Sequence, residues 1–132
     1  AGEEVRDLCD QSQLQHLTEL AHYLAELHDK GIYFRALHLG NVLKLEDGNF
    51  ALIDIADLKT KSRSLSAFAR GRNIAHMFNV SEDKVYFQQF GVNRFLEAYF
   101  QRAKLTDTKK GLLVWRMKRR LRADMRGGLG RL

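Results

Sequence analysis

The sequence predicts an α+β fold that is mostly helical, with one small antiparallel β element in its first third. Three observations predict this class: the 132 residues include no proline, apolar residues recur at three- and four-residue steps, and one Asp-Gly turn separates two short apolar runs. Because proline interrupts helices, its absence favours long ones. The length corresponds to one domain, large enough to bury a core without disulfides or a metal.

The composition is that of an ordinary soluble domain, with 45% hydrophobic and 29% charged residues. No apolar run approaches the roughly 20 residues that a membrane-spanning helix needs. The N-terminal segment has early acidic residues and no apolar core, so no secretory signal is predicted. A single cysteine, Cys9, excludes an internal disulfide framework and favours a reducing compartment, so we expect a cytoplasmic protein.

The clearest predicted helix covers residues 13–30. Its apolar residues fall on one face, and Gly31 stands where a helix is expected to end, after Lys30 in the last turn. The face consists of Leu14, Leu17, Leu20, Ala21, Leu24 and Leu27.

A small β element is predicted next. The short apolar run 32–34 precedes a polar loop, and residues 42–45 and 50–55 form two strands around the turn Glu46-Asp47-Gly48-Asn49. The Asp-Gly pair is typical of a hairpin turn.

The remainder, residues 64–126, is predicted to be a helical subdomain. After the basic stretch 58–64, one helix begins near Ser64 or Ser66, although Gly71 inside it weakens this prediction. A second helix begins at Ser81, with acidic residues including Asp83 in its first turn, and runs to about Ala103. A third helix, capped by the segment Thr106-Asp107-Thr108, covers roughly residues 109–126. The aromatic residues of the second helix are expected to pack in the core, and residues 127–132 are expected to fray.

Asn41 and Asp54 are the first candidate site residues. One ends the polar loop and the other ends the return strand, so a hairpin between them can bring both to the same end. An amide oxygen and a carboxylate suit a hard cation completed by a nucleotide phosphate, with Arg35 and His38 as nearby donors. The alternative is that Asn41 and Asp54 only cap turns.

The window 28–57 resembles the catalytic half of the protein-kinase-like superfamily. Residues 34–41, FRALHLGN, align without a gap on the kinase loop H-R-D-L-x-x-x-N, and the 13-residue step from Asn41 to Asp54 matches the step to the metal-binding Asp. The ending Leu-His-x-Gly-Asn and the segment 70–74 are most similar to the bacterial lipopolysaccharide-kinase family, which includes core heptose and Kdo kinases and toluene-tolerance proteins. The resemblance covers about residues 15–80.

This resemblance implies a phosphotransferase fold in which Asn41 and Asp54 hold a Mg²⁺ that bridges the phosphates of ATP. It further implies that Arg35 braces the loop and that a sugar hydroxyl is the acceptor. The base position, however, is Ala36, which cannot accept a proton, and loss of a positioned base costs about 10²–10⁴-fold. Phe34 also replaces the usual His, and Asp57 is a weak substitute for the base.

The sequence shows no glycine-rich phosphate loop and no strand Lys with its helix Glu, which are parts of a kinase N-terminal lobe. Residues 1–12 resemble the segment just after the hinge between lobes. We therefore expect an isolated C-terminal lobe whose partner is the missing N-terminal lobe. By itself it is expected to be inactive and to bind ATP weakly or not at all.

Two other readings remain open. Ala36 suits a pseudokinase that serves as a binding or regulatory module. A basic helical nucleic-acid binder would make the kinase match accidental, although no specific nucleic acid is expected.

The net charge of +6 is uneven, because residues 1–100 carry 11 Lys and Arg against 14 Asp and Glu, a net −3, whereas residues 101–132 carry 11 against 2, a net +9. In the basic helix 109–126, apolar residues recur every four positions at Leu113, Met117, Leu121 and Met125, with Trp115 nearby. Such a helix can lie on an anionic membrane, bind nucleic acid, or present a solvated face. The family resemblance favours a peripheral position at the inner membrane.

Overall fold

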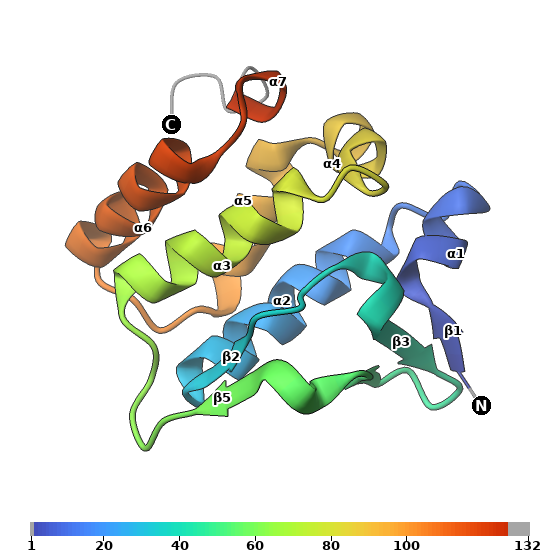
Figure 1. Ribbon diagram of the computed structural model, residues 1–132, viewed down its shortest axis with the longest axis horizontal. Helices are drawn as coiled ribbons and strands as arrows, with labels where there is room; N and C mark the ends of the chain where they lie inside the picture. Colours follow the sequence, from blue (N-terminus) through green and yellow to red (C-terminus); the bar gives the residue numbers. More distant parts are fainter. Residues whose placement is uncertain (1, 127–132) are drawn as a thin grey trace.

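Helices stacked on two small antiparallel sheets form this mostly helical α+β chain (Figure 1). The computed structural model describes residues 2–126, and of Asp57 only the backbone. The α-helices are α1 (Val5–Asp10), α2 (His16–Asp29), α3 (Ala67–Asn79), α4 (Lys84–Phe90), α5 (Val92–Arg102), α6 (Asp107–Arg120) and α7 (Ala123–Arg126). Two short 3-10 helices are η1 (Leu39–Asn41) and η2 (Ile55–Asp57).

The strands form two separate sheets. They are β1 (Gly2–Glu4), β2 (Ile32–Phe34), β3 (Val42–Leu45), β4 (Phe50–Leu52) and β5 (Leu58–Thr60). The first sheet has the order β1-β3-β4, with Val42 opposite Leu52, and the second pairs β2 with β5, with Phe34 opposite Leu58. Along the chain, the β3–β4 hairpin therefore lies between β2 and β5, the two strands that pair with each other in the second sheet.

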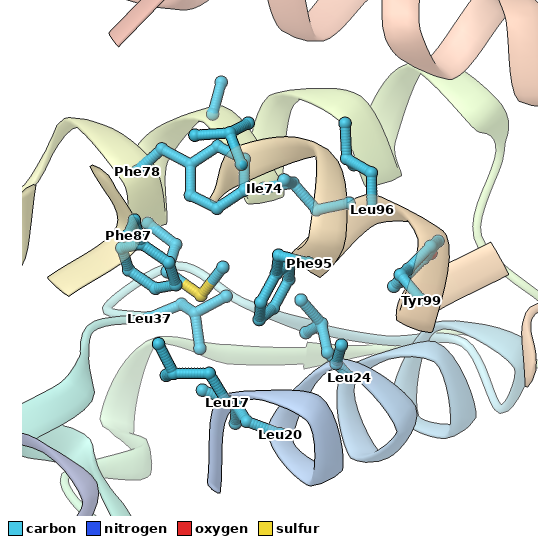
Figure 2. Packing of buried hydrophobic residues seen from close by; sticks show 14 of the residues in the cluster. Leu17, Leu20, Leu24, Leu37, Ile74, Phe78, Phe87, Phe95, Leu96 and Tyr99 are labelled. Carbon is cyan, nitrogen blue, oxygen red and sulfur yellow. The ribbon is translucent and has the colours of Figure 1, made fainter. Parts of the chain in front are cut away.

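The predicted first helix is confirmed as α2, and its apolar face is the floor of the core. Gly31 ends it with a positive φ of 84°, and a Cβ there would lie 2.3 Å from the carbonyl oxygen of Arg63. Figure 2 shows leucines of α2 facing Leu37 of the loop and aromatic residues from α3, α4 and α5. Phe78, Phe87 and Phe95 contact one another edge to face, with ring centroids 4.9–5.5 Å apart. The core thus joins both halves of the chain.

Helix α3 is confirmed, and of the two expected start positions the structure selects Ser66, whose Oγ accepts the Ala69 N–H at 3.1 Å. It packs chiefly on α6, as α2 does on α5, and Figure 1 shows α3 and α6 side by side. The approach is close at Gly71, where a Cβ would lie 2.5 Å from the Leu113 carbonyl oxygen. Glycine is therefore required by the contact between the two helices.

Several predicted boundaries are wrong. The return strand ends at Leu52, not at residue 55, because Asp54 turns the chain with a φ of 60°. The basic stretch after it contains strand β5, which was not predicted. Its partner is β2, about 25 residues earlier, and the three residues of β5 are too few to show an alternation of apolar and polar residues. The helix predicted over 81–103 is two helices broken at Gly91, whose φ is 104°, and Ser81 lies in a turn before the first of them.

The last predicted helix is also divided. Thr106 caps it as expected, with its Oγ1 accepting the Lys109 N–H at 3.2 Å, but α6 ends at Arg120 and the short α7 follows. Residues 127–132, which were expected to fray, lie outside the described part of the chain.

Candidate functional site

The open end of the β3–β4 hairpin brings Asn41 and Asp54 to the same place on the fold. The Asn41 carbonyl oxygen accepts the Ile53 N–H at 3.0 Å, so Asn41 faces the residue that directly precedes Asp54. The Asn41 side chain is buried, and its Nδ2 donates to the Ala36 carbonyl oxygen at 3.0 Å. This bond ties the end of the loop to the predicted base position.

Asp54 has a left-handed backbone, with φ 60° and ψ 51°. That conformation costs a non-glycine residue about 1–2 kcal/mol, and such strain is often found at functional sites. The residue is exposed, and within residues 2–126 its carboxylate makes no hydrogen bond or ion pair. The left-handed turn ends the strand and leaves the carboxylate open to a ligand.

The two side chains suit a hard cation. Because Nδ2 of Asn41 is occupied by Ala36, the amide oxygen Oδ1 is left, and it has no partner in the described part of the chain. With the Asp54 carboxylate it offers two oxygen donors, which is the number that Mg²⁺ usually takes from protein when phosphates and water supply the rest. In chemical type, these two donors match what a magnesium–phosphate ligand takes from protein.

The other predicted site residues lie along the same loop. Ala36 is half-buried and brings no proton acceptor. Arg35 is exposed and, among the described residues, makes no hydrogen bond or ion pair, so no bracing contact to the loop is present. The Asp57 backbone ends η2, and its side chain lies outside the described part.

A buried carboxylate that the sequence did not single out holds this loop. Asp83 is fully buried, accepts the Leu39 N–H at 2.9 Å, and pairs with Arg6 at 2.7 Å from Nε to Oδ1. The hydrogen bond to Asp83 raises the pKa of Arg6 against the opposing effect of burial. From the sequence, Asp83 was expected only in the first turn of a helix. Its bond to Leu39 could not be predicted, because a partner 44 residues away leaves no local pattern.

His38, expected as a phosphate donor, also stabilises the loop through its other ring nitrogen, Nδ1. Its Nδ1 lies 3.1 Å from Arg6 Nη2 and accepts the Gly40 N–H at 3.1 Å. Since Nδ1 accepts from both donors, a neutral ring carries its proton on Nε2. Arg6, His38 and Asp83 therefore form one polar cluster beneath the loop that ends at Asn41.

Three other histidines and Cys9 make contacts within the fold. His28 is fully buried between Tyr99 and Asn73, while His16 contacts Gln13 and His22 contacts Gln101. Within residues 2–126 no three His, Cys, Asp or Glu side chains are grouped to hold a metal. Cys9 is buried, and burial raises the pKa of its thiol to about 12, so the thiol is neutral at pH 7.

The basic C-terminal helix divides into a buried ladder and an exposed face. Leu113, Met117, Leu121 and Met125 are each at most 1% exposed, so the four-residue ladder packs in the core. Trp115 is 51% exposed to solvent and Leu112 is 41% exposed to solvent. The ring of Phe68 in α3 meets the Trp115 ring edge to face, with the two ring centroids 6.2 Å apart. Any surface that α6 offers a partner is therefore this aromatic face and its cations.

Comparison with known proteins assigns no family, since no protein-family model and no curated protein matches this chain. No helix within the described residues is long and apolar enough to cross a membrane.

Proposed function

We propose that this chain is the C-terminal lobe of a kinase-like protein related to the bacterial lipopolysaccharide core sugar kinases. In the intact protein the lobe binds MgATP, and where the protein is active the γ-phosphoryl group passes to a sugar hydroxyl. The carrying observation is the open end of the hairpin, where Asn41, bonded to the Ala36 carbonyl, lies beside the residue preceding Asp54.

In this proposal Asn41 and Asp54 hold Mg²⁺, which when bound neutralises charge on the nucleotide phosphates. The bond from Asn41 Nδ2 to Ala36 orients the amide so that its oxygen is the free ligand. The Arg6–Asp83 pair fixes the backbone two residues earlier, at Leu39. These contacts pre-organise the site, and pre-organised electrostatics is the main protein contribution to phosphoryl transfer.

Because Ala36 stands at the base position, the proposal has two forms, a slowed kinase and a pseudokinase. With no side chain to accept the hydroxyl proton, a kinase of this type is slowed by about 10²–10⁴-fold. A pseudokinase would keep the nucleotide site and lose transfer altogether. The two forms share Asn41 and Asp54 and differ only in turnover.

The test uses the protein joined to an upper lobe that carries the phosphate loop and the strand Lys. We expect Asn41→Ala and Asp54→Asn each to weaken Mn²⁺-dependent ATP binding by at least about tenfold, because each removes one of two protein ligands. Glu46→Gln is the matched control, since Glu46 is an exposed carboxylate near the turn at the opposite end of the hairpin. Unchanged metal-dependent binding in Asp54→Asn would refute the metal assignment.

Turnover in the same protein separates kinase from pseudokinase. Ala36→Asp should raise ATP-dependent transfer to a sugar acceptor by about 10²-fold or more if the parent is a slowed kinase. Intact ATP binding with no transfer by either form would favour the pseudokinase. A measurable wild-type rate that Ala36→Asp leaves unchanged would place the base elsewhere. This chain alone should transfer no phosphate.

We also propose that the exposed face of α6 contacts an anionic membrane surface. Trp115, Leu112 and Phe68 form an apolar patch, and the Arg119 guanidinium lies 5.1 Å from the Trp115 ring centroid. Aromatic residues beside cations are typical of the membrane interface, where each cation adds at most about 1 kcal/mol. Contact would be reversible, because the apolar ladder of α6 is buried in the fold.

Vesicle co-sedimentation tests the membrane contact. The chain should sediment with anionic but not with zwitterionic vesicles, and Arg119→Glu with Arg122→Glu should remove most of the binding. Lys30→Glu with Lys104→Glu reverses the same charge at exposed positions elsewhere and should weaken binding less. Equal sedimentation with both lipids, or with neither, would exclude the contact.

A further inference from the structure

A cleft of about 720 Å³ lies beside the candidate site, between the β2–β5 pair and helices α3 and α6. Its volume is in the range of small-molecule sites, roughly 300–1,000 Å³. Five of its lining residues are cations, and none of the described lining residues is acidic. The cations are Arg35, Lys59, Lys61, Arg72 and Arg120.

Among the described residues, these cations form no ion pair with a carboxylate, although elsewhere in residues 2–126 Arg6, Arg70 and Arg102 do. A concave surface with charges of one sign focuses its field and concentrates an oppositely charged ligand. The cleft is therefore built to attract an anion.

One of the cations is already oriented. Arg72 donates from Nε to the Tyr33 hydroxyl at 3.1 Å, and its guanidinium lies 5.3 Å from the Tyr33 ring centroid. Both Nη groups are left to donate, and this fork matches a phosphate. Because Tyr33 holds the side chain, binding costs less conformational entropy than for a free arginine.

The wall formed by α3 and the end of α6 is also ordered. Asn79 donates to the Arg120 carbonyl oxygen at 2.9 Å and accepts the Arg122 N–H at 3.0 Å, which fixes the end of α6 against α3. His76 lines the same wall, and burial, with a smaller effect of His38, lowers its pKa. This imidazole adds a hydrogen-bonding group to the cations of the cleft.

We propose that this cleft binds a small molecule carrying about two phosphate groups. Five unpaired cations match the three to four negative charges of two phosphate monoesters, and arginine forks recognise phosphate oxygens in pairs. The concave shape favours a small ligand over a nucleic-acid duplex, which needs an extended basic surface. This binding is inferred from the cleft itself, and neither the kinase resemblance nor the metal site requires it.

The position of the cleft gives the ligand a role. Arg35 lines it and directly precedes Ala36, so a bound phosphorylated molecule lies beside the loop assigned to phosphoryl transfer. Resting on the proposed function, this makes a phosphorylated sugar the acceptor class. The binding itself needs no nucleotide and no upper lobe, so it can be measured separately.

The experiment is calorimetric titration of this chain, without nucleotide or metal, with fructose 1,6-bisphosphate, fructose and inorganic phosphate. We expect the bisphosphate to bind, inorganic phosphate to bind more weakly, and fructose not to bind. Lys59→Gln with Lys61→Gln should weaken bisphosphate binding by about tenfold, since each exposed charge contact contributes about half of one decade. Both side chains are exposed, so the fold is retained.

The matched control is Lys104→Gln with Lys109→Gln, which lowers the net charge equally at exposed positions outside the cleft. It should leave bisphosphate affinity within about twofold of the wild type. Equal loss in both double variants, or no bisphosphate binding at all, would overturn the proposal.

Vesicles with phosphatidic acid distinguish a lipid phosphate: tighter binding to them that depends on Lys59 and Lys61 would identify a lipid headgroup as the source of the phosphates. Tighter binding of duplex DNA than of bisphosphate, lost in the same variant, would overturn the small-molecule assignment.

Discussion

At the scale of single residues, Asp83 does the most to hold the candidate loop. Its carboxylate satisfies the Leu39 N–H and the Arg6 guanidinium at once, and it is completely buried. Removing the charge leaves a partly buried arginine without its partner and a backbone donor with a weaker acceptor. The polar cluster under the loop is therefore sensitive to the replacement of one Asp83 carboxylate oxygen by an amide nitrogen.

We predict that Asp83→Asn lowers the free energy of unfolding by about 3 kcal/mol. Glu82→Gln is the neighbouring control, because Glu82 is exposed and lies 3.9 Å from Arg6. It should cost less than about 0.5 kcal/mol. Urea unfolding measures both, and faster hydrogen exchange of the Leu39 amide in Asp83→Asn would show that the loop itself is loosened. Similar losses in the two variants would contradict this role.

At the scale of elements, the contact between α3 and α6 decides how the C-terminal third is attached. Gly71 lets the two backbones approach, since a Cβ there would lie 2.5 Å from the Leu113 carbonyl and 3.2 Å from the Met117 nitrogen. From the sequence, this glycine only weakened the prediction of a helix. Its value becomes visible when α6 is placed against it.

Two glycine substitutions test this contact. Gly71→Ala should destabilise the protein by about 1–3 kcal/mol, because backbone atoms must move apart to admit the methyl group. Gly111→Ala, within α6 and with nothing within 4 Å of its Cβ position, should stabilise it by about 0.5–1 kcal/mol through helix propensity. Thermal unfolding distinguishes the two, and a stabilising Gly71→Ala would show that the helices are not in close contact.

At the scale of the whole molecule, a buried polar network joins helix α2 to α3 and α5. His28 of α2 contacts the Tyr99 hydroxyl at 2.7 Å and Asn73 Oδ1 at 2.9 Å, while Arg70 reaches Asp29 at 2.9 Å. Burial lowers the pKa of His28 to about 3, an effect that Arg70 reinforces and the Asn73 hydrogen bond opposes. The network therefore depends on a neutral imidazole.

This makes the stability pH-dependent in a defined direction. In the unfolded chain His28 has a pKa of about 6.5, so below that pH the unfolded state binds a proton that the folded state does not. The contribution of His28 is complete above about pH 6.5 and falls by about 1.4 kcal/mol per pH unit towards pH 3. Between pH 6.5 and 5 the wild type should lose about 2 kcal/mol more than His28→Gln, as urea unfolding would show. Parallel losses would mean that another group is responsible.

The sequence alone determined the helices whose signals are local. α2 was predicted from its apolar period and from Gly31, the start of α3 was predicted near Ser64 or Ser66, and that of α6 was predicted from the cap at Thr106. The β3–β4 hairpin was predicted from its turn, and the positions of Asn41 and Asp54 at one end of it followed from the spacing. These features depend on residues within a few positions of one another, so a linear pattern contains them.

Tertiary structure alone decided the features that depend on distant partners. Strand β5 exists because β2 pairs with it, and β1 because β3 does. The burial of Asp83, the position of Gly71 against α6 and the cleft of five cations each join residues far apart in the chain. Even the basic helix was ambiguous until α3 covered its apolar ladder, because an amphipathic period shows that one face is buried but not what buries it.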